Sequence, residues 1–263
     1  MNSNNPVFSR GFPDGQRYAK FDVATPDAAQ LQDMYNKPAY APPRYMTLDD
    51  VVVRTGATLG TLVATGALSW ALVAGHPSVV GIALLAALVG FVLALVVSFR
   101  QSTSPALILT YAACEGVFLG AVSHVFNARY QGIVAEAVVG TVGVFAGMLV
   151  VYKTGAIRVT PRFTRWLFGA LIGVVVLMLA NLVASLFSTN GLGLRSGGGL
   201  AIVFSLVCIG VAALSFLLDF DMVDKAIRRG TPERFAWYAA FGLTVTLVWL
   251  YLEILRLLSY LRD

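Results

Sequence analysis

Residues 78–99 read SVVGIALLAALVGFVLALVVSF, an uninterrupted run of 22 residues without a charged side chain. A helix that crosses a bilayer needs about 20 predominantly apolar residues, so this run has the length and composition of a membrane span. Similar runs continue on both sides of it, which gives seven candidate spans: 55–74, 78–99, 104–126, 132–152, 165–187, 199–219 and 235–254. Because lipid leaves open strand edges without partners, the spans are predicted to be helices. The sequence therefore predicts an all-α, seven-span transmembrane helix bundle.

The composition of the chain supports this class. Its 263 residues are 57% hydrophobic and 13% charged, whereas soluble domains are about 45–50% apolar and about 25% charged. This excludes a soluble domain, a disordered chain and a nucleic-acid binder with a basic face. Cys114 and Cys208 both lie in apolar runs and the two histidines are far apart, so we predict no cofactor and no zinc or iron site. The expected surroundings of the chain are the lipid bilayer and, in addition, membrane-protein partners.

The first residues differ from the rest, because six of the ten prolines lie within residues 1–43. We predict a disordered or loosely docked, Pro-rich cytoplasmic arm over 1–46 and a seven-helix membrane domain over 47–263. Within the arm, Pro42-Pro43-Arg44-Tyr45 matches the PPxY pattern that WW domains bind, although a polyproline linker is the simpler interpretation. Thr47-Leu48-Asp49-Asp50 then has the pattern of a helix start, with Thr47 as N-cap and an acid three residues later.

Lys and Arg residues predict the orientation of the spans, because cytoplasmic loops carry an excess of them. With the N-terminus inside, eleven lie on the inner side: Arg44, Arg54, Arg100, Lys153, Arg158, Arg162, Arg165, Lys225, Arg228, Arg229 and Arg234. Four lie on the outer side: Arg129, Arg195, Arg256 and Arg262. We therefore predict a cytoplasmic N-terminus and an outer C-terminus. Arg outnumbers Lys fifteen to four and Ala, Val and Gly are abundant, which is typical of a GC-rich bacterium and favours the plasma membrane.

Four Gly-x-x-x-Gly pairs lie in the spans: Gly56/Gly60, Gly116/Gly120, Gly143/Gly147 and Gly169/Gly173. Such pairs let helix backbones approach closely, so they predict a tightly packed bundle.

Glu115 is the most unexpected ionisable residue, because it lies in the middle of span 104–126. A charge near the bilayer centre costs on the order of 2.5–3.5 kcal/mol, so such a residue needs a reason. No basic residue lies three or four positions from it. Glu115 is either part of a functional pathway or a neutral side chain that is hydrogen-bonded to another helix.

Three aspartates end span 199–219. Asp221 has Lys225 four residues later and Asp224 has Arg228, so both are predicted to form ordinary i,i+4 ion pairs. Asp219 has no such partner and lies deepest in the apolar run, which makes it the functional candidate of the three.

The remaining charges have simpler explanations. Glu253 lies about 31 Å along the last helix if that helix begins near Pro232, so it is expected at the outer surface, paired with Arg256. Glu136 is expected to interact with the positive end of its helix, and His124 is expected near the membrane interface. Arg100, at the inner end of span 78–99, either reaches water or serves as a counter-ion for Asp219.

Taken together, several segments resemble the Bax inhibitor-1 family of seven-span membrane proteins, especially its bacterial members. They are Arg100 with the following Glu115-Gly116 and Ser123-His124, Glu136-Ala137 with Gly140-Thr141, Asp219-Phe220-Asp221-Met222-Val223, and Leu250-Tyr251-Leu252-Glu253-Ile254-Leu255-Arg256. The resemblance implies six helices around a central seventh and a pH-sensitive calcium leak that is controlled by two aspartates near an arginine. Asp219 matches the first aspartate and Arg100 the arginine. Thr246 stands where the second aspartate would be, and Asp221, Glu115 or Thr246 could fill part of its role.

The chemistry of a carboxyl group is compatible with such a leak. Ca²⁺ is bound by carboxylate and carbonyl oxygens, and protonation would remove both the charge and the coordination. We therefore expect a pathway lined by Glu115 and Asp219, which would bind Ca²⁺ transiently and respond to pH. The alternative is a non-conducting regulator that binds and restrains membrane partners such as quality-control proteases. The chain is not expected to be an enzyme, because it has no Gly-x-Ser-x-Gly, His-Glu-x-x-His or Gly-x-Gly-Asp motif.

Overall fold

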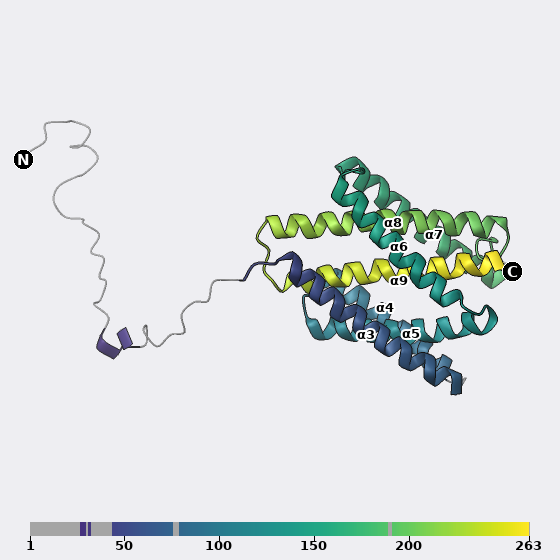
Figure 1. Cartoon of the computed structure of the whole chain (residues 1–263), viewed down its shortest axis with the longest axis horizontal. Coiled ribbons are helices and arrows are strands. Elements are labelled where there is room, and N and C mark those ends of the chain that lie inside the picture. Colours follow the sequence, from purple (N-terminus) through teal and green to yellow (C-terminus); the bar gives the residue numbers. More distant parts are fainter. Residues whose placement is uncertain (1–26, 30, 33–43, 76–78, 189–190, 263) are drawn as a thin grey trace, which may run out of the picture. The chain divides into compact units, whose positions relative to one another are not determined.

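The computed structural model describes residues 27–29, 31–32, 44–75, 79–188 and 191–262. Seven long apolar helices make up most of this part of the chain, which confirms the predicted all-α, seven-span architecture (Figure 1). They are α3 (Leu48–Gly75), α4 (Val79–Arg100), α5 (Pro105–Arg129), α6 (Ile133–Thr154), α7 (Pro161–Phe187), α8 (Gly199–Arg228) and α9 (Phe235–Arg262). Helices α8 and α9 continue beyond their predicted spans, so their charged ends are still helical.

Local sequence signals begin and end several of these helices. Pro105 is the first residue of α5 and Ser104 precedes it in extended conformation, which is the arrangement that proline favours. Helix α7 begins at Pro161, earlier than its predicted span, because the Thr160 side chain accepts a hydrogen bond from the Phe163 amide at 3.2 Å. Gly155 ends α6 in a left-handed conformation with φ 68°, which glycine adopts without a steric penalty.

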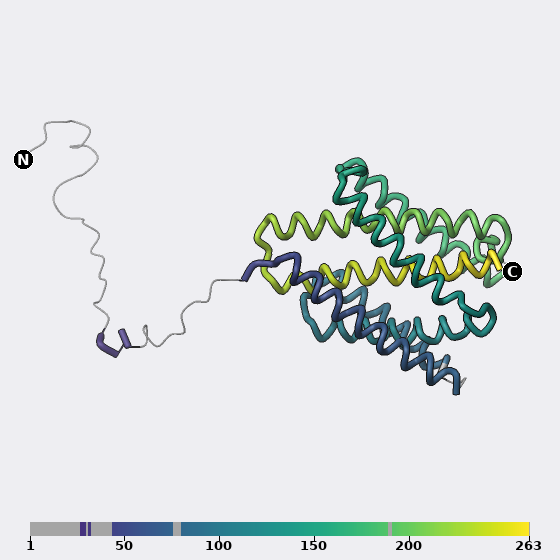
Figure 2. The backbone as a smooth tube through the Cα atoms, in the orientation of Figure 1, coloured from purple at the N-terminus to yellow at the C-terminus, as the bar shows by residue number. Residues whose placement is uncertain are grey.

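Helix α9 lies at the centre of the bundle (Figure 2). It packs directly against α3, α5, α6 and α8, whereas α4 packs on α5 and α3, and α7 packs on α8. The resemblance implied a central seventh helix, and α9 occupies that place with α4 and α7 as the outermost elements. Buried residues therefore continue along the whole length of α9, from Ala236 to Ser259.

One of the four Gly-x-x-x-Gly pairs makes the predicted close approach. A β-carbon on Gly116 would overlap the Leu62 carbonyl and the Thr65 hydroxyl of α3, and one on Gly120 would overlap the Gly66 carbonyl. The pairs in α6 and α7, and the pair at the start of α3, would meet nothing within 4 Å. The glycines therefore bring α5 and α3 together, while the other pairs do not contribute to tight packing.

The chain consists of two compact units, residues 1–42 and residues 43–263. Met46 is buried in the main core, and its amide donates to the Thr231 carbonyl at 2.8 Å. The Glu233 amide donates to the Arg44 carbonyl at 2.9 Å, and Tyr45 forms an isolated β-bridge with Pro232. Residues 44–46, which we call the strap, thus dock on the loop between α8 and α9. The predicted arm before residue 44, with the first two residues of the PPxY pattern, lies almost entirely outside the described residues.

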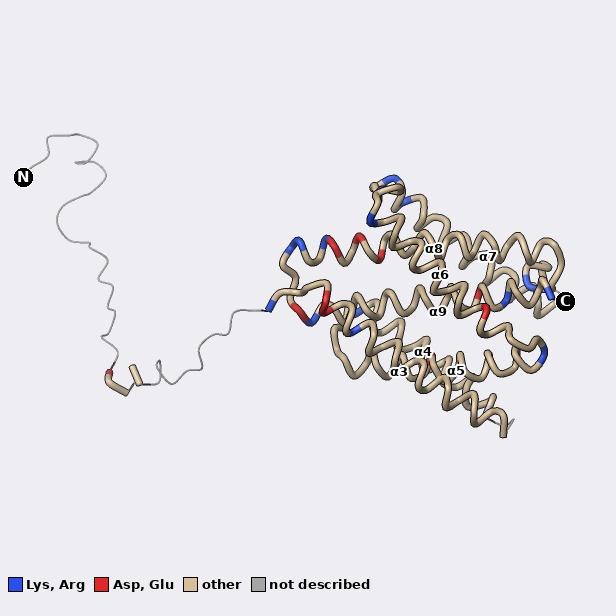
Figure 3. The backbone as a smooth tube through the Cα atoms, viewed as in Figure 1, with Lys and Arg blue, Asp and Glu red and all other residues tan. Residues whose placement is uncertain are grey.

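Charged residues gather towards the two ends of the helix bundle, and long middle stretches of the helices carry none (Figure 3). This is the distribution expected of a bundle whose middle contacts lipid. An odd number of spans places the start of α3 and the end of α9 on opposite sides of the membrane.

Candidate functional site

The strongest candidate site is a polar contact between α8 and the central helix α9. The Thr246 hydroxyl donates a hydrogen bond to Oδ2 of Asp219 at 2.8 Å. Asp219 lies nine residues before Arg228, the last residue of α8, which corresponds to about 14 Å along the helix. The structure thus joins the aspartate that the apolar run indicated and the threonine that the resemblance aligned with a second aspartate.

The hydroxyl group in this contact has two possible acceptors. The Thr246 oxygen also lies 3.2 Å from the Gly242 carbonyl oxygen, one helical turn earlier. A hydroxyl carries a single proton, so the bond to Asp219 and the bond to Gly242 compete. Rotation of one side chain would break the link between α8 and α9 and would leave no unsatisfied hydroxyl donor.

Asp219 has no ion pair with any residue that the structure describes. Its neighbours Asp221 and Asp224 are paired as predicted, with Lys225 at 2.6 Å and Arg228 at 2.9 Å. An ionised carboxylate with a single neutral donor is costly in an apolar setting. Of the three aspartates, Asp219 is therefore the one without a basic partner in the described part of the chain, so a proton or a cation would have to neutralise its charge.

One of the two roles that the sequence left open for Arg100 is that of a counter-ion for Asp219. Arg100 is exposed at the end of α4 and forms no ion pair within the described chain. The physical reason is the position of α4, which packs on α5 and α3 and not on α8. Of the two roles that the sequence left open, the structure favours an arginine that reaches water.

Glu115 lies at a different helix contact from Asp219. Its carboxyl group is half-buried against Gly90 of α4, where an added β-carbon would lie 3.4 Å from Oε1. No hydrogen bond or ion pair to Glu115 is present among the described residues. These residues also contain no cluster of three or more His, Cys, Asp or Glu side chains that could hold a metal ion. Glu115 and Asp219 therefore belong to two different helix contacts.

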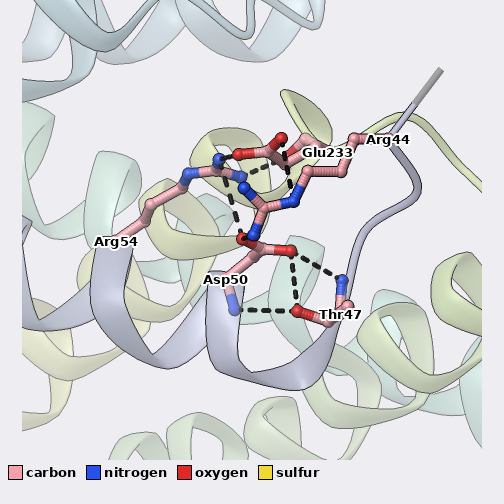
Figure 4. Close-up of polar contacts among 5 residues, drawn as sticks. All are labelled: Arg44, Thr47, Asp50, Arg54 and Glu233. Atoms are coloured by element: carbon pink, nitrogen blue, oxygen red, sulfur yellow. Dashed lines mark hydrogen bonds and ion pairs between the residues drawn. The ribbon is translucent and has the colours of Figure 1, made fainter. Parts of the chain in front are cut away.

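A charged network at the start of α3 was not anticipated from the sequence (Figure 4). The Arg54 guanidinium contacts both the side chain and the carbonyl of Glu233 and lies over the Trp237 ring at 5.7 Å. Arg44 lies 3.4 Å from Glu233 and 3.3 Å from the buried carboxylate of Asp50. The two carboxylates carry as much negative charge as the two arginines carry positive charge, so the network has no net charge. Its contacts join the strap, α3 and the α8–α9 loop.

The predicted helix cap lies inside this network. Oδ2 of Asp50 accepts hydrogen bonds from the Thr47 amide at 2.9 Å and the Thr47 hydroxyl at 2.7 Å. The Asp50 amide in turn donates to the Thr47 hydroxyl at 3.2 Å. This reciprocal pattern confirms the capping box that the spacing of the two residues predicted.

Glu253 is paired as predicted but is far more buried than predicted. It forms the expected ion pair with Arg256 at 3.0 Å and a second one with Arg195, from the α7–α8 loop, at 3.3 Å. Both arginines contact Oε1, whereas Oε2 is buried and has no hydrogen-bond partner in the part of the chain that the structure describes. Glu253 is 2% exposed, because α9 is the central helix and the loop covers its end.

Two other predicted positions have partners from distant segments. Glu136 forms an ion pair with Arg262 at 2.6 Å, which ties the start of α6 to the end of α9. The His124 ring packs edge-on against Trp70 with their centroids 5.4 Å apart. Both contacts fix helix ends, and neither residue lies at the Asp219–Thr246 contact.

Comparison with known proteins gives one family. Residues 5–263 match the model of the family described as Bax inhibitor 1 like, which is nearly the whole chain. A protein of Chlamydia muridarum (strain MoPn / Nigg), described as an uncharacterized protein, is 30% identical over 124 residues, which cover 47% of each chain. The match thus spans about half the length of that relative.

Proposed function

This chain belongs to the Bax inhibitor 1 like family and is an integral membrane protein, and from that premise we propose that it forms a pH-sensitive leak pathway for cations such as Ca²⁺. Asp219 is the controlling group in this proposal and Thr246 is its partner. The observation that carries the proposal is the 2.8 Å hydrogen bond between them, which links α8 to the central helix and involves a carboxylate without a basic partner among the described residues.

The oxygen atoms around Asp219 suit a hard cation. Ca²⁺ is bound by carboxylate and carbonyl oxygens, and the Asp219 carboxylate, the Thr246 hydroxyl and the Gly242 carbonyl meet at this point. They are too few to hold Ca²⁺ permanently, because Ca²⁺ takes about six to eight oxygen ligands. Weak, incomplete coordination is what a conducting position requires, since the ion must also leave.

The competition for the Thr246 hydroxyl supports a switch at the same place. When Asp219 is ionised, it accepts the hydrogen bond and attracts a cation. When Asp219 is protonated, it loses both its charge and its preference as an acceptor, and the hydroxyl can turn to the Gly242 carbonyl. We therefore propose that cation flux falls as the pH is lowered through the titration of Asp219.

The orientation in this proposal follows from the Lys and Arg residues, which favour a cytoplasmic N-terminus and an outer C-terminus in the plasma membrane. Asp219 would then lie towards the cytoplasmic end of the pathway. The proposal assigns neither a catalytic reaction nor a bound cofactor to the chain.

The test is calcium flux into liposomes that contain the purified full-length chain, measured between about pH 6 and pH 8. The wild type should conduct more at the higher pH. Asp219→Asn, which resembles the protonated acid, should have a low flux that does not change with pH. Thr246→Val should alter the pH response, whereas Thr110→Val, which removes an exposed hydroxyl bonded only to its own helix, should not.

Two outcomes would contradict the proposal. One is a wild-type flux no greater than that of empty liposomes at every pH, and the other is an Asp219→Asn variant with the flux and pH response of the wild type. Removal of residues 1–42, which form a separate unit, should leave the flux unchanged. An absent flux together with a membrane partner that is lost on this removal would instead support the regulator of membrane proteins.

A further inference from the structure

An apolar groove lies between α3 and α6, and its volume is about 540 Å³. Helices α5 and α9 form its floor, through residues such as Leu119, Leu247 and Val248. Its walls extend along α3 from Leu59 to Trp70. The polar groups of the proposed leak, which belong to Asp219, Thr246 and Gly242, are not among the lining residues, so this groove is a separate feature.

We propose that this groove is a binding site for a single acyl chain of a membrane lipid. Its dimensions fit that occupant. The helical rise from Leu59 to Trp70 corresponds to a length of about 16 Å. A volume of about 540 Å³ over that length gives a mean cross-section of about 33 Å².

This cross-section distinguishes between the apolar occupants that a membrane offers. An α-helix with its side chains is about 10–12 Å across, which corresponds to roughly 80–110 Å². A helix from a partner or from a second copy is therefore wider than the groove and would contact only its opening. A hydrocarbon chain, with carbon–carbon contacts at about 4 Å, is narrow enough to lie in the groove and touch both walls.

The polar groups of the groove are already satisfied. The Ser123 and Tyr251 hydroxyls form a hydrogen bond with each other at 2.6 Å. The Thr141 hydroxyl donates to the Ala137 carbonyl of its own helix at 2.7 Å. Ordered water needs about two to four polar partners, and these groups offer few free positions. The groove is therefore suited to an apolar occupant.

The groove also opens to the outside of the bundle, where the acyl chains of the bilayer lie. Val63 of α3, and Val138 and Val142 of α6, line it and are exposed on the outside of the bundle. In a membrane these surfaces contact lipid hydrocarbon, so an acyl chain can enter sideways without leaving the bilayer. A dry cavity without an occupant would lose the dispersion contacts of its lining, which favours occupancy.

The test uses the full-length protein in detergent micelles, titrated with a phosphatidylcholine that carries bromine atoms on one acyl chain. Bromine quenches tryptophan fluorescence at short range, and Trp70 lines the groove whereas Trp166 is exposed on α7. The wild type should show a quenching component that saturates. Trp70→Phe should remove that component, and Trp166→Phe should leave it.

A second pair of variants tests the groove itself. Val138→Phe fills it, and Val139→Phe adds the same ring to the neighbouring, more exposed position outside it. Val138→Phe should raise the lipid concentration for half-saturation about tenfold or more, because overfilling a packed site is unfavourable. Val139→Phe should not change it. Circular dichroism checks that each variant keeps its helices, and Ala67→Leu is the substitute if Val138→Phe does not fold.

Three results would overturn the proposal. The first is quenching that rises linearly with lipid in every variant, which means that only bulk lipid contacts Trp70. The second is a saturable component that depends on Trp166. The third is an oligomer of the wild type that Val138→Phe dissociates, which means that protein covers the groove.

Discussion

The buried carboxylate of Glu253 should depend on its two arginines jointly and not on either one alone. Its Oε1 lies 3.0 Å from Arg256 and 3.3 Å from Arg195, and its side chain is 3% exposed, against 27% and 28% for the arginines. If Arg256→Met or Arg195→Met is made alone, the remaining arginine still neutralises the carboxylate. Each single change should therefore cost about 1 kcal/mol of unfolding free energy, below the usual value for a buried charged hydrogen bond because the arginines are partly hydrated.

The double variant should cost more than the sum of the single changes. Without either arginine, Glu253 is a buried carboxylate with no base, and removing the partners of a buried charge costs about 3–5 kcal/mol. The coupling between the two substitutions should thus be at least about 1 kcal/mol. Glu253→Gln provides the matched control, because in that background the arginine substitutions should have little effect.

The measurement is an unfolding titration with sodium dodecyl sulfate in mixed micelles at a pH of about 8, far above the pKa of a carboxyl group in a model peptide. Unfolding is followed by the loss of helical circular dichroism. Free energies of the four arginine combinations are compared, with Glu253 intact and with Glu253→Gln, as a thermodynamic cycle. If the double variant equals the sum of the single variants within about 0.5 kcal/mol, the two arginines do not act together on one buried charge, and the reasoning is refuted.

Three further predictions follow from the fold. Gly120→Ala should destabilise the bundle by about 2 kcal/mol or more, because the new β-carbon would overlap the Gly66 carbonyl. Gly60→Ala, which meets no neighbour, should be neutral or stabilising by less than about 1 kcal/mol. Equal unfolding midpoints for these two variants would contradict this packing. Thr47→Ala should lower the unfolding free energy by about 1 kcal/mol through loss of the α3 cap, and Thr47→Ser should keep most of that stability. The same detergent titration measures both variants. An alanine variant as stable as the wild type would mean that the cap is not formed in the membrane. A protease added to inverted membrane vesicles should remove residues 1–42, and the same protease added to intact spheroplasts should not. The opposite pattern would contradict the cytoplasmic N-terminus that the Lys and Arg residues predict.

Features that depend on nearby residues could be predicted from the sequence. The seven helices followed from the apolar runs, because hydrocarbon thickness fixes the length of a span. The ion pairs of Asp221 and Asp224 and the cap formed by Thr47 and Asp50 followed from spacings of three or four residues. One turn of helix determines such contacts, and no knowledge of the neighbouring helices is needed.

Contacts between distant segments could not be predicted in this way. The pairing of Arg54 with Glu233 and of Glu136 with Arg262 depends on which helices become neighbours, and apolar spans of similar composition do not specify that. The depth of Glu253 was misjudged for the same reason. Its height along the helix followed from the number of residues, but its burial depends on the central place of α9 and on the loop that carries Arg195.

The candidate site contains both a feature that nearby residues predict and contacts that depend on distant segments. Asp219 stood out because no base lies one turn from it, and this local observation agrees with the structure. The position of Thr246 opposite Asp219 followed from a resemblance between whole sequences and not from any spacing. The sequence left two roles open for Arg100 and could not choose between them, because it does not show that α4 packs on α5 and α3 and not on α8.

The link between Arg54 and Glu233 also has a consequence for biosynthesis. The two residues are 179 positions apart in the chain. A ribosome adds about 5–20 residues per second, so the first span waits roughly 9 to 36 s for its partner to be made. During that interval Asp50 is the only acid of the network that has been made, so Arg44 and Arg54 share one carboxylate. The first helix must then stay in the membrane without its final neighbours. Helix α3 therefore obtains its final neighbours only when α9 is made. A chain interrupted before residue 233 should remain a substrate for the proteases of membrane quality control.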